Sequence, residues 1–173
     1  MAKTNANKEK VIELLNEARA SELTAILQYM SQHYELEDQD FGKPALMFKT
    51  IAIDEMRHAE LFANRILFLG GTPTSTPDGK EKKGQELEQM LDTNHELETG
   101  AVAMYNDHAK KCAELGDNIS RDLFETILAQ EENHLDQFDN INKHIKKLGA
   151  AYLATLAGGQ AEPAGGAGTP GQA

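Results

Sequence analysis

The folds open to this chain are limited first by a four-residue pattern that occurs twice. Glu55-Met56-Arg57-His58 and Glu131-Glu132-Asn133-His134 both read Glu-x-x-His, and a shift of 76 residues superimposes them. The same shift aligns further identical residues: Glu22 with Glu98, Ala25 with Ala101, Tyr29 with Tyr105, Phe48 with Phe124, and Phe62 with Phe138. Such self-similarity at a fixed spacing indicates that one structural unit occurs twice.

Each repeat has the periodicity of two amphipathic helices. Apolar residues recur every three or four positions, Pro44 fits the first turn of a helix, and Gly70-Gly71 is a strong helix stop. Gly116-Asp117-Asn118 predicts a tight turn with an N-cap for the helix that follows. The predicted helices have the approximate bounds 11–37, 44–69, 85–115, 118–148 and 150–157.

Loop lengths predict how these helices connect. Short loops make helices one and two antiparallel, and likewise helices three and four. Residues 72–84 are rich in Pro, Gly, Ser and Thr. They predict a long connector without secondary structure, which at ~3.3 Å per residue can span the bundle. We therefore predict an all-α four-helix bundle with one long crossover between helices two and three, plus a short C-terminal fifth helix.

The domain organisation follows from the same pattern. Residues 11–157 are expected to form one domain. Residues 1–10 are expected to be a flexible N-terminus, and the Gly/Pro/Ala-rich residues 158–173 a disordered tail.

The spacing inside each repeat predicts a metal site. Glu22 lies 33 residues before Glu55, and the second repeat has the same separation. Folding each gap about its short loop brings the glutamate level with its Glu-x-x-His pattern, whose i, i+3 spacing puts carboxylate and imidazole on one helix face. Six ligands are therefore expected to converge midway along the bundle: Glu22, Glu55, His58, Glu98, Glu131 and His134. Four buried carboxylates need cations, so we expect two divalent ions, iron or manganese, bridged by two glutamates.

Longer segments around these residues resemble the bacterioferritins, haem-containing members of the ferritin-like di-iron carboxylate superfamily. The resemblance runs from Val11 to about Ala157 and is carried by Glu22-Leu23-x-Ala25-x-x-Gln28-Tyr29, Ile53-Asp54-Glu55-Met56-Arg57-His58-Ala59, Arg65-Ile66-Leu67-Phe68-Leu69, and Ser120-Arg121-Asp122 through Glu131-Glu132-x-His134. It implies a ferritin-like fold and a ferroxidase. The enzyme would oxidise Fe²⁺ with O₂ or H₂O₂ at an intrasubunit di-iron centre, and the cage would store the Fe³⁺ mineral.

The resemblance also assigns roles to individual residues. Glu55 and Glu131 match the bridging carboxylates of the family, and Glu22 and Glu98 match the terminal ones. Tyr29 matches a tyrosine near the centre that could hydrogen-bond a ligand and donate an electron. An ordinary buried tyrosine with a satisfied hydroxyl is the alternative interpretation of Tyr29.

Met56 carries a second functional hypothesis. It follows Glu55 by one residue, or ~100° around the helix, so it should point away from the metal cavity. A helical methionine is usually core filler. The resemblance instead implies that Met56 ligates a haem shared with a second subunit across a two-fold axis.

The resemblance further implies an assembly and its partners. We expect a homo-oligomer, a 24-mer cage built from two-fold dimers, with a ferredoxin-type reductant for iron release. Two positions depart from features of some family members. Thr50 and Asp54 stand where some members have a His and an Asp of an inner-surface iron site, and Gln137 stands where some have Trp.

Composition excludes several classes of function. A net charge of −11 disfavours nucleic acid or an anionic membrane as partner. No apolar run approaches the ~20 residues needed to cross a bilayer, and the N-terminus lacks a secretion signal, so a cytoplasmic protein is expected. The alternative function is a non-storing di-iron peroxidase or oxidase of the rubrerythrin type. Cys112, the single cysteine, cannot form that family's usual rubredoxin-like module.

One further functional hypothesis and one expectation about the remaining histidines do not involve catalysis. A structural bundle that has lost its activity is a third hypothesis, which the intact ligand set disfavours. The histidines outside the two patterns have no partner pattern and are expected at the surface or at interfaces: His33, His95, His108 and His144.

Overall fold

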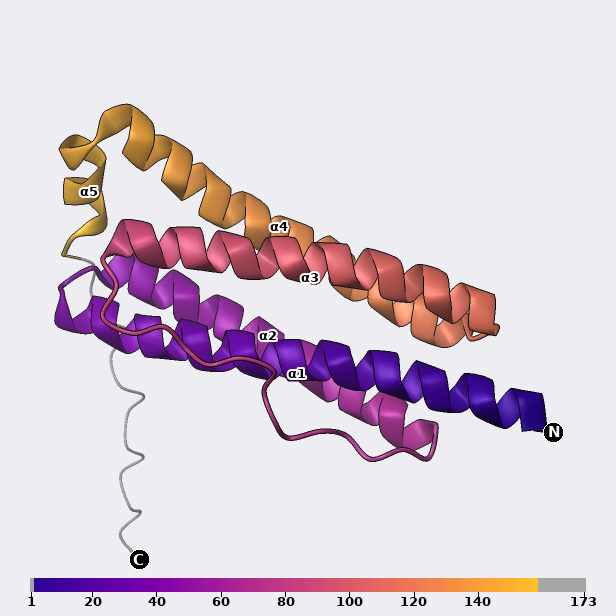
Figure 1. Cartoon of the computed structure of the whole chain (residues 1–173). Helices are drawn as coiled ribbons and strands as arrows, with labels where there is room; N and C mark the ends of the chain where they lie inside the picture. Colours follow the sequence, from indigo (N-terminus) through magenta and orange to yellow (C-terminus); the bar gives the residue numbers. More distant parts are fainter. Residues whose placement is uncertain (1, 159–173) are drawn as a thin grey trace, which may run out of the picture.

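The computed structural model describes residues 2–158, which contain five helices (Figure 1). They are α1 (Ala2–Asp38), α2 (Gly42–Phe68), α3 (Leu87–Leu115), α4 (Asn118–Leu148) and α5 (Ala150–Leu156). Helices α1 and α2 form one antiparallel hairpin and α3 and α4 the other, with α5 at the end of the bundle where α4 finishes. The predicted all-α four-helix bundle with a short fifth helix is confirmed. Most of the expected tail, residues 159–173, lies outside the described residues.

The turns between paired helices close through residues in the left-handed conformation. Asp40 has a φ of 61° between α1 and α2, where the Phe41 N–H donates to the Leu36 carbonyl at 2.9 Å. Gly116 has a φ of 82° between α3 and α4, a value that glycine adopts without strain. The Asp117 carboxylate then accepts from Ser120 N at 3.0 Å and caps α4.

Helix α1 begins well before the predicted start at Val11. Residues 1–41 contain neither proline nor glycine, so nothing in the sequence stops the helix from extending to Ala2. The Asn7 side-chain amide donates to the Leu115 carbonyl at 3.1 Å and ties this extension to the end of α3. The flexibility expected of residues 1–10 stays a prediction.

The crossover between α2 and α3 runs along α1 (Figure 1). It contains no helix or strand, as predicted, but α1 side chains fix its course. The Asn16 side chain donates to Thr72 O and accepts from Thr74 N at 2.7 Å. Further along α1, the Gln28 side chain binds the backbone of the crossover in the same way. Its Nε2 donates to Lys82 O at 2.9 Å and its Oε1 accepts from Lys82 N at 2.7 Å. The crossover is therefore an ordered strap.

The packing of the core follows the sequence repeat. Two apolar clusters are present, and each contains one of the two tyrosines that the 76-residue shift relates. The rings of Phe62 and Tyr105 meet edge to face with centroids 5.6 Å apart. Their counterparts Phe138 and Tyr29 meet with centroids 5.7 Å apart. The two hairpins thus repeat in three dimensions as they do in the sequence.

Two of the histidines expected at the surface or at interfaces are instead buried within the chain. His33 and His108 are each 3% exposed. The ring of His33 bonds through Nδ1 to the Ala45 carbonyl at 2.9 Å, and Nε2 of His108 lies 3.2 Å from Glu17 Oε2. Each imidazole has a polar partner, which offsets part of the free-energy cost of burying it. Among the described helices, none is both long and apolar enough to span a bilayer.

Candidate metal centre

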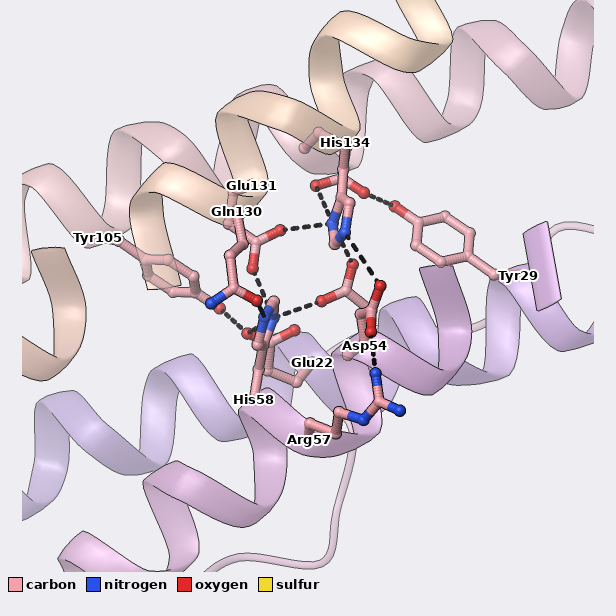
Figure 2. A network of polar contacts seen from close by, with 11 residues as sticks. Glu22, Tyr29, Asp54, Arg57, His58, Tyr105, Gln130, Glu131 and His134 are labelled. Atoms are coloured by element: carbon pink, nitrogen blue, oxygen red, sulfur yellow. Dashed lines mark hydrogen bonds and ion pairs between the residues drawn. The ribbon is translucent and has the colours of Figure 1, made fainter. Parts of the chain in front are cut away.

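The six predicted ligands meet halfway along the bundle (Figure 2). Each of the four long helices contributes, and none of the six residues is more than 4% exposed. Glu22 comes from α1, Glu55 and His58 from α2, Glu98 from α3, and Glu131 and His134 from α4. The i, i+3 spacing places each pair from α2 and α4 on the inward helix face, as the sequence predicts.

The donors form two overlapping groups of four. One group is Glu22, Glu55, His58 and Glu131, and the other is Glu55, Glu98, Glu131 and His134. Within each group the ligand atoms all lie within 4.8 Å of one another. Glu55 and Glu131 belong to both groups. We call the two groups the His58 position and the His134 position.

Both imidazoles turn the same nitrogen toward the shared carboxylates. His58 Nδ1 lies 2.7 Å from Glu55 Oε2 and 2.9 Å from Glu131 Oε1. His134 Nδ1 lies 3.0 Å from Glu55 Oε1 and 3.4 Å from Glu131 Oε2. The lone pairs that could bind cations therefore face one another across the centre of the bundle.

Although these groups lie within ion-pair distance of one another, several of the buried atoms make no well-directed hydrogen bond. They are Glu55 Oε1, Glu131 Oε1 and His134 Nδ1. A buried polar atom without a partner costs about 1–3 kcal/mol, and more when the group is charged. Two cations between the shared carboxylates would satisfy all of these atoms. The oxygen and nitrogen donors suit iron, so the residues present fit a di-iron site.

In the metal-free protein, protons bound to the glutamates and histidines offset the negative charge of the cluster. Burial, and then the charges of Glu55 and Glu131, raise the pKa of Glu22 well above its ordinary value, and the same causes act on Glu98. Burial lowers the pKa of His58, but hydrogen bonds to Glu131 and Glu55 outweigh this and raise it to about 10. The same balance raises the pKa of His134 to about 9.

Two buried tyrosines hold the outer carboxylates. The Tyr29 hydroxyl donates to Glu98 Oε1 at 2.5 Å, and the Tyr105 hydroxyl donates to Glu22 Oε1 at 2.5 Å. Burial, followed by the neighbouring carboxylate charges, raises the pKa of both phenols, which keeps both as neutral donors. Sequence reasoning selected Tyr29 and missed Tyr105 as a site residue, although the 76-residue shift already paired the two.

Two more residues that sequence reasoning did not place in the site contact the outer nitrogens of the imidazoles. Gln130 Oε1 lies 3.0 Å from His58 Nε2. Asp54 Oδ2 lies 3.9 Å from His134 Nε2, while Oδ1 of the same carboxylate accepts from Arg57. Each immediately precedes the glutamate of a Glu-x-x-His pattern, and this was the signal that could have found them.

Met56 lies outside this cluster. Its side chain is 52% exposed, whereas its neighbours Glu55 and His58 are buried, so it points away from the centre of the bundle. Ile53, one turn earlier on α2, is exposed as well. Met56 is therefore an exposed thioether rather than core filler.

A narrow pocket reaches the cluster between α1 and α3. Its walls include the small residues Ser21, Ala25 and Ala101 beside Glu22 and Glu98. Its free volume is about 10 Å³, close to that needed for one water molecule.

Comparison with known proteins places this site in context. The ferritin-like domain family matches residues 12–148. A bacterioferritin of Desulfovibrio desulfuricans is 50% identical over 151 residues, which cover 87% of this chain and 84% of the relative. An X-ray structure of the D. desulfuricans bacterioferritin, concerned with its diiron site in different catalytic states, matches with a TM-score of 0.90 and 46% identity over 98% of both chains. A Mycobacterium tuberculosis bacterioferritin, BfrA, matches with a TM-score of 0.82 and 34% identity, covering 86% of this chain and 94% of that one.

Proposed function

The chain belongs to the bacterioferritins within the ferritin-like family, and on this basis we propose which of its residues carry out iron oxidation. It is an iron-storage protein with a di-iron ferroxidase centre. The assignment of residues rests on the two groups of donors, which share Glu55 and Glu131. The relatives at up to 50% identity are bacterioferritins, so the rubrerythrin-type alternative has no comparable support.

The ligand roles follow from this geometry. Glu55 and Glu131 would hold both Fe²⁺ ions, Glu22 and His58 would complete one position, and Glu98 and His134 would complete the other. The bound pair supplies two electrons, which reduce H₂O₂ to water or O₂ to H₂O₂ with protons from the solvent. Tyr29 and Tyr105 orient the terminal carboxylates through their 2.5 Å hydrogen bonds. The bundle excludes bulk water because every ligand is buried.

We also propose a haem on the outer face of α2. The exposed Met56 thioether beside exposed Ile53 offers a soft ligand and an apolar contact surface. Met56 and its counterpart in a second copy of the chain would together hold the haem. The haem would supply one-electron transfer between an external reductant of ferredoxin type and the stored iron. The 24-mer cage, the choice between O₂ and H₂O₂ and a cytoplasmic location stay predictions.

A matched pair of variants tests the ligand assignment. Glu131→Gln removes a shared carboxylate charge, whereas Glu132→Gln changes the exposed neighbour on the same helix. We expect Glu131→Gln to abolish the rapid phase of Fe²⁺ oxidation, followed as the rise in Fe³⁺ absorbance after mixing with air. Glu132→Gln should oxidise Fe²⁺ as fast as the unmodified protein. Unchanged initial rates in Glu131→Gln would exclude this site as the ferroxidase centre.

A further inference from the structure

The two metal positions are related by the internal repeat but are not equivalent. The shift of 76 residues pairs Glu22 with Glu98, Glu55 with Glu131 and His58 with His134, and it also pairs Tyr29 with Tyr105. It carries Asp54, however, onto Gln130. A carboxylate on one side of the site thus corresponds to a neutral amide on the other.

These two residues act across the bundle, each on the histidine of the other hairpin (Figure 2). Gln130 is on α4 and its Oε1 lies 3.0 Å from Nε2 of His58, on α2. Asp54 is on α2 and its Oδ2 lies 3.9 Å from Nε2 of His134, on α4. Each histidine therefore has a partner behind it that the other histidine lacks.

The orientation of the rings makes this difference matter for metal binding. Nδ1 of each imidazole faces the shared carboxylates, so Nε2 carries the outward N–H when Nδ1 binds a cation. Behind His58 this N–H meets an uncharged amide oxygen. Behind His134 the Asp54 carboxylate lies 3.9 Å from Nε2, which is too far for a hydrogen bond but close enough for its negative charge to favour a cation bound to the ring.

Arg57 offsets this charge only in part. Its guanidinium contacts Oδ1 of Asp54, and the other oxygen, Oδ2, is the one nearest His134. The Arg57 side chain is 69% exposed, so water screens its effect on the buried ligands. The carboxylate charge is shared by both oxygens, so the exposed Arg57 reduces its effect on His134 without removing it.

We propose that the His134 position binds divalent cations more tightly than the His58 position and fills first. The reason is that the negatively charged carboxylate of Asp54 lies behind His134, whereas the uncharged amide of Gln130 lies behind His58. Partners of this kind change metal affinity by roughly 10- to 100-fold, so we expect a separation on the order of tenfold. This inference rests on the di-metal site proposed above. Because oxidation needs both ions, the weaker His58 position sets the Fe²⁺ concentration at which oxidation begins.

A cobalt titration tests the difference in affinity. Metal-free protein is titrated with Co²⁺ in the absence of oxygen, and the visible ligand-field bands report binding. We expect two classes of site, one of each per chain. Glu98→Gln should remove the tighter class and Glu22→Gln the weaker class, because each glutamate serves only one position. Equal affinities in the unmodified protein, or loss of the tighter class in Glu22→Gln, would overturn the proposal.

Exchanging the two supporting residues tests the cause. Asp54→Asn should weaken the tighter class toward the weaker one, and Gln130→Asp should strengthen the weaker class. In the double variant the order should reverse, so that Glu98→Gln then removes the weaker class. A separation that survives Asp54→Asn unchanged contradicts the role of Asp54. If Co²⁺ produces no ligand-field bands at all, the di-metal site itself is wrong, which is a different failure.

Discussion

At the scale of single residues, the site depends on groups that hold the ligands as much as on the ligands themselves. Glu22 and Glu98 are each fixed by one short phenolic hydrogen bond, and both tyrosines are fully buried. A carboxylate held this way is already oriented before a cation arrives. Groups behind metal ligands commonly contribute 10- to 100-fold to metal affinity or activity.

Removing either phenolic hydroxyl should therefore slow iron oxidation. We expect Tyr105→Phe and Tyr29→Phe each to lower the initial rate of Fe²⁺ oxidation roughly tenfold at limiting Fe²⁺. Tyr34→Phe is the matched control, because Tyr34 is on α1 but its side chain is exposed. A normal rate in Tyr105→Phe, with a normal rate in the control, would show that the hydroxyl of Tyr105 has no part in the site.

The protonation of the metal-free cluster predicts how its metal affinity depends on pH. The folded-state pKa values of His58 and His134, about 10 and about 9, lie above the ordinary 6.5, so both imidazoles carry an extra proton at pH 7. A cation must displace these protons. Metal binding at pH 7 should therefore release protons, and affinity should rise as the pH increases toward 9.

Calorimetry in buffers of different ionisation enthalpy measures this release directly. The same raised pKa values stabilise the metal-free fold fully below about pH 6.5, and this contribution is lost as the pH rises through 9 to 10. The melting temperature of metal-free protein should fall over that range. Proton uptake on metal binding would contradict the assigned protonation.

At the scale of the helices, the ends of α2 and α4 are joined by a charged contact. Arg65, in the last turn of α2, donates to both oxygens of Asp117 at 2.7 and 2.8 Å and to the Ser120 hydroxyl at 2.9 Å. Asp117 also caps α4. One carboxylate therefore ends a turn, starts a helix and connects the two hairpins that must align the metal ligands.

Loss of this carboxylate should destabilise the fold. We expect Asp117→Ala to lower the free energy of unfolding by about 1–2 kcal/mol, the usual value of an N-cap residue. Asp122→Ala changes an exposed aspartate in the same helix and should have little effect. Denaturant unfolding at a single protein concentration compares the two. Equal stability of both variants would mean that Asp117 does not support the junction.

How far the sequence predicts the structure also differs between elements. The bundle and the six converging ligands could be predicted from the repeat and from the helix stops at Gly70-Gly71 and Gly116, because both signals can be read directly from the sequence. The long start of α1 was missed because the absence of a breaker is a weaker signal than its presence. The ordering of the crossover by Asn16 and Gln28 depends on contacts between distant segments, which periodicity does not report.

The residues around the ligands were missed for a related reason. Gln130 and Asp54 contact histidines of the opposite hairpin, so within their own helices only their position just before a Glu-x-x-His pattern indicates a role. The burial of His33 and His108 was missed because their partners, Ala45 and Glu17, lie on other helices. Tyr105 is the exception, since its match to Tyr29 was visible in the repeat.

At the scale of the whole molecule, storage requires assembly beyond a single chain. We expect metal-free protein given Fe²⁺ and air to elute as a cage that retains hundreds of iron ions. A dimer retaining about two iron ions per chain would contradict storage. Size-exclusion chromatography with iron analysis of each fraction distinguishes the two.

The haem proposal also belongs to the assembled molecule. Met56→Leu removes the exposed thioether while preserving an apolar side chain, so the purified variant should lose the porphyrin absorption band. Met47→Leu alters a partly buried methionine of the same helix and should keep the band. A band of normal intensity in Met56→Leu would place the haem ligand elsewhere.

The proposed function requires that the two hairpins together bind two cations. Anomalous X-ray diffraction is the most direct test of this binding. Crystals of the metal-free protein would be soaked in ferrous salt without oxygen and measured at the iron absorption edge. We expect two anomalous peaks per chain, both in contact with Glu55 and Glu131, one beside His58 and the other beside His134. A single peak, peaks away from these side chains, or no peak would contradict the account.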